Sequence, residues 1–158
     1  MNNSAQTNPN HPDHIQWLSD FIRLEIVLWE RVDNRLRNEN KLSLAFFELL
    51  YLLLQESQRS LRVGDIARKL QVTVGGTSKL IDRIEREGFI QRENDPLNRR
   101  ASLIVLTKAG ERVVSSAIKT YEAEMKEVLD GVLNELEQSQ MYDYVVRLLK
   151  AAKAKEPA

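Results

Sequence analysis

The chain has 158 residues, with 23 Lys and Arg against 23 Asp and Glu, and it contains no cysteine. This length can bury one substantial core without covalent staples, and the lack of cysteine excludes disulfides, thiol redox chemistry and thiolate metal sites. A net charge of zero argues against a protein that coats nucleic acid with its whole surface.

Residues 1–12 have neither a basic region nor an apolar segment, so we expect a disordered lead-in and no secretion signal. A helix is predicted over 13–36, because apolar residues recur there at helical spacing. Its apolar stripe includes Trp17 and Trp29 and is wider than a helix covered on one side needs. We therefore expect this helix to pack against a second copy of the chain.

The most apolar stretch is 44–54, in which only Glu48 is not apolar. It predicts a buried helix, since it is far shorter than the ~20 residues that cross a bilayer. Ser43 is placed as its N-cap, with Leu42 and Phe47 as a hydrophobic staple. We expect a polar loop over 56–60, no membrane partner and a cytoplasmic location.

Two helices then lie very close together, over 64–70 and 74–87, joined by a three-residue turn. Thr73 is a good N-cap for the second helix, and Gly88 is a good stop. Alternating residues over 89–94 and 101–106 predict two strands. A helix, a short turn, a second helix and a hairpin in this order are typical of a protein that places its second helix in the major groove of DNA.

The charge distribution supports this interpretation of the middle of the chain. From Arg62 to Arg112 there are eleven Lys and Arg against seven Asp and Glu, a net charge of +4, so the remainder carries −4. A basic middle between acidic flanks suits a DNA-binding unit held between helices that face other partners.

Thr107 is placed to cap a helix that runs to about 130, and a last helix is predicted over about 136–154. Glu122, Glu124 and Glu127 are expected on the solvated side of the first of these. The predicted fold is mainly α, with six helices and one small β-hairpin. We divide the chain into an N-terminal dimerisation helix (13–36), a winged helix-turn-helix domain (37–107), C-terminal dimerisation helices (108–154) and a frayed tail (155–158).

Five segments in this order resemble the MarR family of bacterial winged helix-turn-helix regulators: 42–50, 61–70, 79–90, 95–100 and 105–110. They cover about half of the chain closely and the flanking helices loosely. The resemblance implies a homodimer that binds double-stranded DNA at an inverted-repeat operator, acts as a repressor and is released by a small-molecule effector. It implies no cofactor.

The second helix of the pair should direct Thr77, Leu80, Ile81 and Ile84 inward. Its candidate DNA-binding residues are then Thr73, Val74, Gly75, Gly76, Ser78, Lys79 and Arg83. Two glycines in a first helical turn cost roughly 1 kcal/mol each relative to alanine. They indicate either a close approach of the backbone to DNA or an irregular start of the helix.

The hairpin loop carries the other candidate DNA-binding residues: Asp95, Asn98, Arg99 and Arg100. We expect Asp95 to pair with Arg99 across the turn and one arginine to enter the minor groove, although the sequence does not say which. Asn98 stands where the resembling family usually has a second aspartate. Arg62, Arg68 and Lys69 could contact phosphates or form a merely solvated helix face.

The sequence lacks the residues that a metal site or a catalytic site would require. His11 and His14, the only histidines, lie at the start of the chain, so we expect no metal site. No nucleophile has a histidine beside it, so we expect no enzyme.

The resemblance places an effector pocket among the helices predicted over 13–36, 44–55 and 108–130, and we expect an anionic or phenolic ligand there. Its residues are unknown: Trp17, Trp29, Phe47 and Tyr51 are candidates by location only. The alternative function is a winged-helix adaptor that binds protein instead of DNA.

Overall fold

The computed structural model describes residues 13–154, and every side chain in that range except those of Arg99 and Arg100. The two predicted tails, 1–12 and 155–158, lie outside the described residues. The elements are α1 (His14–Asn40), α2 (Leu44–Gln55), β1 (Ser60–Arg62), α3 (Val63–Leu70), α4 (Val74–Arg86), β2 (Ile90–Asp95), β3 (Asn98–Leu106), α5 (Lys108–Leu129) and α6 (Glu135–Lys153). The predicted fold class, mainly α with a small hairpin, is confirmed.

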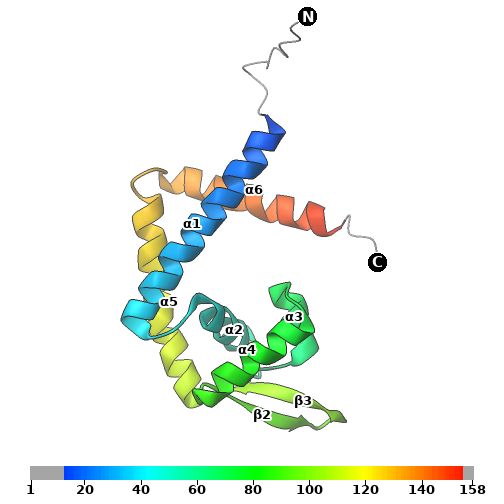
Figure 1. Ribbon diagram of the computed structural model, residues 1–158. Helices are drawn as coiled ribbons and strands as arrows, with labels where there is room; N and C mark the ends of the chain where they lie inside the picture. The colour runs from blue at the N-terminus through cyan, green and yellow to red at the C-terminus, as the bar shows by residue number, and fades with distance from the viewer. Residues whose placement is uncertain (1–12, 155–158) are drawn as a thin grey trace, which may run out of the picture.

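These elements form a compact lobe and two long helical arms, α1 and α5 (Figure 1). The lobe contains α2, α3, α4 and the sheet, whereas α1 and α5 pack against each other and extend away from it. At the end of α5 remote from the sheet the chain turns into α6. Among residues 13–154, no helix combines the length and the apolar content that crossing a bilayer requires.

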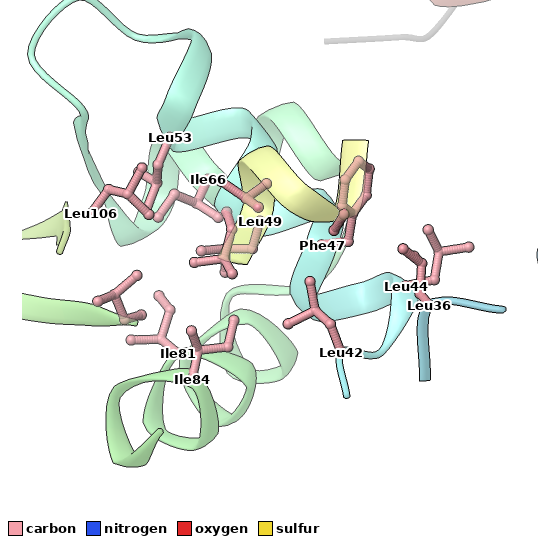
Figure 2. Packing of buried hydrophobic residues seen from close by; sticks show 14 of the residues in the cluster. Leu36, Leu42, Leu44, Phe47, Leu49, Leu53, Ile66, Ile81, Ile84 and Leu106 are labelled. Atoms are coloured by element: carbon pink, nitrogen blue, oxygen red, sulfur yellow. The ribbon is translucent and has the colours of Figure 1, made fainter. Parts of the chain in front are cut away.

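The core lies under α2, as the apolar stretch predicts. Leu49, Leu50 and Leu53 of α2 are fully buried and pack with apolar residues of every neighbouring element of the lobe. Figure 2 shows Ile81 and Ile84 of α4 directed toward this cluster from below. The Ser43 hydroxyl caps α2 by accepting the Phe46 N–H at 3.2 Å.

The helix α1 ends at Asn40, four residues later than the apolar pattern indicates. Its last turn is polar and therefore carries no hydrophobic signal, but it is stabilised by α5: the Asn40 amide donates to Ser116, and Thr120 donates to Glu39. Lys41 then stops the helix in the left-handed region, at φ 57°, with its N–H bonded to the Leu36 carbonyl.

An ion-pair network around the buried Glu124 joins α1 to α5. Arg31 Nε donates to Glu124 at 2.6 Å, and Arg35 Nη1 donates to the other Glu124 oxygen at 2.9 Å. Burial raises the pKa of Glu124, but the bonds to Arg35 and Arg31 outweigh burial and hold that pKa below its ordinary value. The expectation that Glu124 is solvated is wrong, because the periodicity of α5 does not reveal two arginines on a helix 89 to 93 residues away.

The sheet has three strands in the order β1-β3-β2, all antiparallel. In β3, Leu106 pairs with Ile90, and Ser102 with Asn94, so the hairpin β2–β3 is aligned over most of its length. The strand β1 was not predicted, because three residues, Ser60–Arg62, are too few to display an alternating pattern. It anchors the start of α3 to the base of the hairpin.

Large apolar surfaces stay uncovered in the described part of the chain. Only Val32 and Leu36 of α1 are buried, while apolar side chains over its N-terminal half are largely exposed, among them Leu18 at 52% and Ile22 at 49%. No residue of α6 is buried, and its Tyr144, Leu148 and Leu149 are exposed as well. Exposed patches of this kind mark surfaces that meet another protein.

Candidate nucleic-acid interface

The helix α4 is a regular helix with one buried and one exposed face. Thr77, Ile81 and Ile84 are fully buried, and Leu80 is half-buried, as the sequence predicts. The Thr73 hydroxyl accepts the Gly76 N–H at 3.1 Å and caps the helix. The first turn of α4 therefore begins regularly at Val74, which removes the alternative of an irregular helix start.

The exposed face of α4 contains the predicted DNA-binding side chains. Val74, Gly75, Gly76, Lys79 and Arg83 are exposed, and Ser78 is half-buried with its hydroxyl donating to the Val74 carbonyl. The Arg83 guanidinium lies 5.3 Å from the centre of the Phe46 ring, which orients it through a cation–π contact. The structure thus brings two cations and a hydroxyl to one helix face.

Gly75 is not required by the fold. A Cβ built on it meets no atom within 4 Å, and its backbone does not adopt the left-handed conformation that favours glycine. At Gly76, by contrast, a Cβ would lie 3.1 Å from the Thr73 hydroxyl oxygen. The packing of the protein itself therefore gives no reason for the helix-destabilising glycine at 75.

The hairpin β2–β3 forms the wing, with Pro96 and Leu97 as its two-residue turn. Asp95, at the end of β2, is 3% exposed. Its carboxylate accepts the Leu97 N–H at 2.8 Å and both Nε and Nη2 of Arg62, at 2.6 and 2.5 Å. The Leu97 N–H and the Arg62 guanidinium hold the pKa of Asp95 below its ordinary value, although burial acts in the opposite direction.

In the structure Asp95 is thus paired with Arg62, whereas its pairing with Arg99, expected from the loop sequence, stays a prediction. The side chains of Arg99 and Arg100 lie outside the described residues, whereas their backbone belongs to β3 immediately after the turn. Asn98 opens β3 opposite Asp95. The hairpin sequence alone does not indicate Arg62, because this residue lies 33 positions before Asp95 and reaches the wing through the strand β1.

A second contact, which the sequence did not indicate, ties the wing to α4. Arg92 of β2 binds two carboxylates on the outer side of α4: its guanidinium donates to Asp82 at 2.5 Å and forms a close ion pair with Glu85. Its backbone N–H also donates to Glu85 at 3.1 Å. These contacts join α4 to the wing at the surface of the protein.

The other predicted phosphate contacts are engaged within the chain. Arg68 pairs with Asp65 at 2.6 Å, and Lys69 pairs with Glu56 at 2.7 Å. Both pairs are partly exposed, and such pairs contribute at most about 1 kcal/mol, so they can exchange for phosphates at little cost. Residues 13–154 bring no group of three acidic or histidine side chains together around a metal position, and His11 lies outside that range.

Comparisons with known proteins agree with this geometry. The MarR family model matches residues 42–102. An HTH-type transcriptional regulator from Bacillus cereus is 30% identical over 141 residues, covering 88% of this chain and 94% of the relative. Another, YfiV from Bacillus subtilis, is 26% identical and covers 70% of this chain and 69% of that protein.

Solved structures share the fold. Sco3205, a MarR family transcriptional regulator from Streptomyces coelicolor in complex with DNA, has a TM-score of 0.81 at 20% identity, covering 96% of this chain and 94% of that one. CouR from Rhodococcus jostii RHA1, bound to p-coumaroyl-CoA, has a TM-score of 0.70 at 22% identity, covering 84% and 90%. Fold, sequence relatives and the family match agree, and the chain belongs to the MarR family of DNA-binding transcriptional regulators.

Proposed function

We propose that the protein is a homodimeric repressor that binds an inverted-repeat operator and is released from it by a small molecule. The observation that supports this DNA-binding geometry is that the exposed face of α4 and the wing are joined side by side. Arg92 joins them through Asp82 and Glu85, and Arg62 holds the end of β2 through Asp95. Such a unit can enter a major groove with α4 and reach the flanking minor groove with the wing.

On α4, we assign Lys79 and Arg83 to phosphates or guanine edges and Ser78 and Thr73 to hydrogen bonds with DNA. Val74, at 58% exposed, is placed to touch a thymine methyl group. On the wing, Asp95 serves as the anchor and Asn98, Arg99 and Arg100 as the contacting segment. The structures of Sco3205 with DNA and of CouR with p-coumaroyl-CoA support these two classes of ligand for proteins of this fold.

The test is selection of random duplex DNA on the purified protein at moderate salt, followed by titration of the enriched site. We expect a palindrome with half-sites about one helical turn, roughly 10 base pairs, apart, bound by one dimer. Affinity should fall steeply with salt, by a log–log slope of roughly 0.9 per neutralised phosphate. An absence of any enriched motif would favour the protein-binding adaptor, and in vitro transcription from a promoter overlapping the site would distinguish repression from activation.

The glycine at 75 gives a prediction that separates folding from DNA binding. Gly75→Ala is expected to raise the free energy of unfolding by about 1 kcal/mol, since alanine is the better helix former and its methyl group meets open space. The same methyl group should keep the backbone from approaching DNA and lower operator affinity about tenfold, a cost of ~1.4 kcal/mol. Thermal unfolding and DNA titration of one preparation measure both effects.

Gly131→Ala serves as the control, because a Cβ at that turn also meets no atom within 4 Å and lies outside the interface. It should leave DNA affinity unchanged. Full operator affinity in the Gly75→Ala protein would contradict the close approach.

The dimer prediction concerns the N-terminal half of α1. Leu18 and Ile22 are half-exposed, one helical turn apart, on a surface that nothing in residues 13–154 covers. Changing both to glutamate should produce a folded monomer, because buried unpaired charges oppose association, and sedimentation should show this directly. Asn34→Glu, at an exposed polar position of α1, is the matched control. A dimer of undiminished affinity in the double variant would refute the assignment.

Deleting the whole helix would be a poorer test. Val32 and Leu36, in its C-terminal half, belong to the core, and Arg31 and Arg35 compensate the buried Glu124. Such a truncation would unfold the lobe as well as break the dimer.

A further inference from the structure

A cavity of about 520 Å³ lies between α2 and α5, with Leu70 of α3 at one side. Three aromatic rings line it, those of Phe47, Tyr51 and Tyr121, together with the carboxylates of Glu48 and Glu122. A second cavity of about 270 Å³ opens between α1, α2 and α5 and shares Glu48 and Tyr121 with the first. Glu48 therefore stands at the junction of the two cavities.

The two linings carry charge of one sign. Glu48 and Glu122 line the first cavity, and Glu25 joins Glu48 in the second. Neither lining, which falls wholly in the described part of the chain, includes Lys, Arg or His. An anionic ligand would meet repulsion here without any compensating cation, whereas a positively charged group would be attracted.

Glu48 differs from the other carboxylates that the fold buries. Asp95 is bound by Arg62, and Glu124 by Arg31 and Arg35. Glu48 is half-buried among apolar neighbours, and burial raises its pKa with no donor or cation from residues 13–154 acting against it. A half-buried carboxylate at the wall of two cavities is placed to bind a positively charged partner that arrives from outside.

The rings beside Glu48 suit the same partner. Phe47 stacks with Tyr121, with ring centres 5.1 Å apart, and with Tyr51, at 5.6 Å. Aromatic faces attract cations through their quadrupole, and they also bury the flat apolar body of a ligand. Of the four aromatic residues considered from the sequence, Phe47 and Tyr51 line the first cavity and Trp29 the second, whereas Trp17 stacks on Phe21.

We propose that this cavity binds an organic cation with an aromatic or apolar body, and that Glu48 is the counter-ion of its charged group. The inference rests on the proposed regulation by a small molecule and replaces the anionic or phenolic class expected from the sequence. Because the cavity is lined by α2 and α3 of the lobe and by α5 of the arm, a ligand in it acts on the angle between them. A ligand that binds one arrangement better shifts the population of DNA-competent dimers.

The test uses four probes with the same body and different heads: trimethyl(4-phenylbutyl)ammonium, 4-phenylbutylamine, 4-phenylbutanol and 4-phenylbutyrate. Binding to the full-length protein is measured by titration calorimetry without DNA. We expect both cations to bind at least tenfold more tightly than the carboxylate. The affinity of the alcohol should lie between that of the cations and that of the carboxylate. Glu48→Gln should lower the affinity for the quaternary ammonium about tenfold and leave the affinity for the alcohol unchanged.

Glu87→Gln is the matched control, since it removes the same charge at a residue that lines neither cavity, and it should bind all four probes like the parent protein. Equal or tighter binding of the carboxylate by the parent protein overturns the inference, whether or not the Glu48 variant folds. So does undiminished cation affinity in a folded Glu48→Gln protein. Glu48-dependent cation binding that leaves operator affinity unchanged would support the cation site and contradict the regulatory part of the proposed function.

Discussion

Replacing Arg99 and Arg100 together with alanine is expected to weaken operator binding by about 100-fold or more while leaving the dimer intact. Each arginine that contacts DNA contributes roughly 1–3 kcal/mol, and a narrow minor groove attracts guanidinium groups with particular strength. Both residues follow the two-residue turn at the start of β3, so the sheet carries them at the tip of the wing. Fluorescence anisotropy with the selected operator measures the loss.

The salt dependence makes this prediction more specific. Loss of two cations at the interface should reduce the log–log salt slope by about 2, one for each contact. Lys119→Ala with Lys126→Ala removes the same charge from exposed positions of α5 and should change neither the affinity nor the slope beyond a weak long-range effect. Operator binding that survives the wing variant at full strength would remove the wing from the interface, and a protein partner that tolerates the change would favour the adaptor.

Arg62 and Asp95 have a different place at the wing from Arg99 and Arg100. Asp95 is buried and bound by Arg62, whose side chain stays 45% exposed. We propose that this pair fixes the end of β2, which leads into the turn and the start of β3. The sequence singled out Asp95 but did not indicate Arg62 as its partner, because a local pattern cannot show which distant strand closes the sheet.

Most helices were predictable because they have an apolar pattern at helical spacing, and three of them also have a recognisable cap. Ser43, Thr73 and Thr107 all cap the helices expected from them, and the buried face of α4 is the predicted one. What the sequence could not show arises from pairs far apart in the chain. Arg92 with Asp82 and Arg31 with Glu124 depend on how elements pack, and nothing local distinguishes these residues from solvated charges.

The environment of Glu48 likewise could not be predicted from the sequence. Within an otherwise apolar helix, a single carboxylate could equally face solvent or a cavity. Only the packing of α5 across α2 shows that it stands at the junction of two cavities. Candidate ligand residues therefore stayed unknown at the level of sequence, although two of the aromatic candidates do line the first cavity.

The second large effect is expected at Gly110, where α5 begins. A Cβ at this buried position would lie 2.1 Å from the Phe89 carbonyl oxygen and 2.8 Å from Leu106 Cδ1. The carbonyl cannot move freely, because it accepts the Thr107 N–H at 3.0 Å, and the Thr107 hydroxyl donates to the neighbouring Gly88 carbonyl at 2.8 Å. We expect Gly110→Ala to lower the free energy of unfolding by about 3 kcal/mol, the upper part of the range for overpacking.

That loss corresponds to a fall in melting temperature of roughly 6–12 °C for a chain of this size, measured by thermal unfolding at equal protein concentration. Gly64→Ala is the control, since a Cβ in the first turn of α3 meets no atom within 4 Å and should stabilise the protein slightly. A Gly110→Ala protein as stable as the parent would show that α5 can move away from the base of the wing. Gly110 brings α5 against the residue before β2 and the end of β3, so we expect the rigidity of this contact to limit how far a shift of α5 displaces the DNA-binding surface.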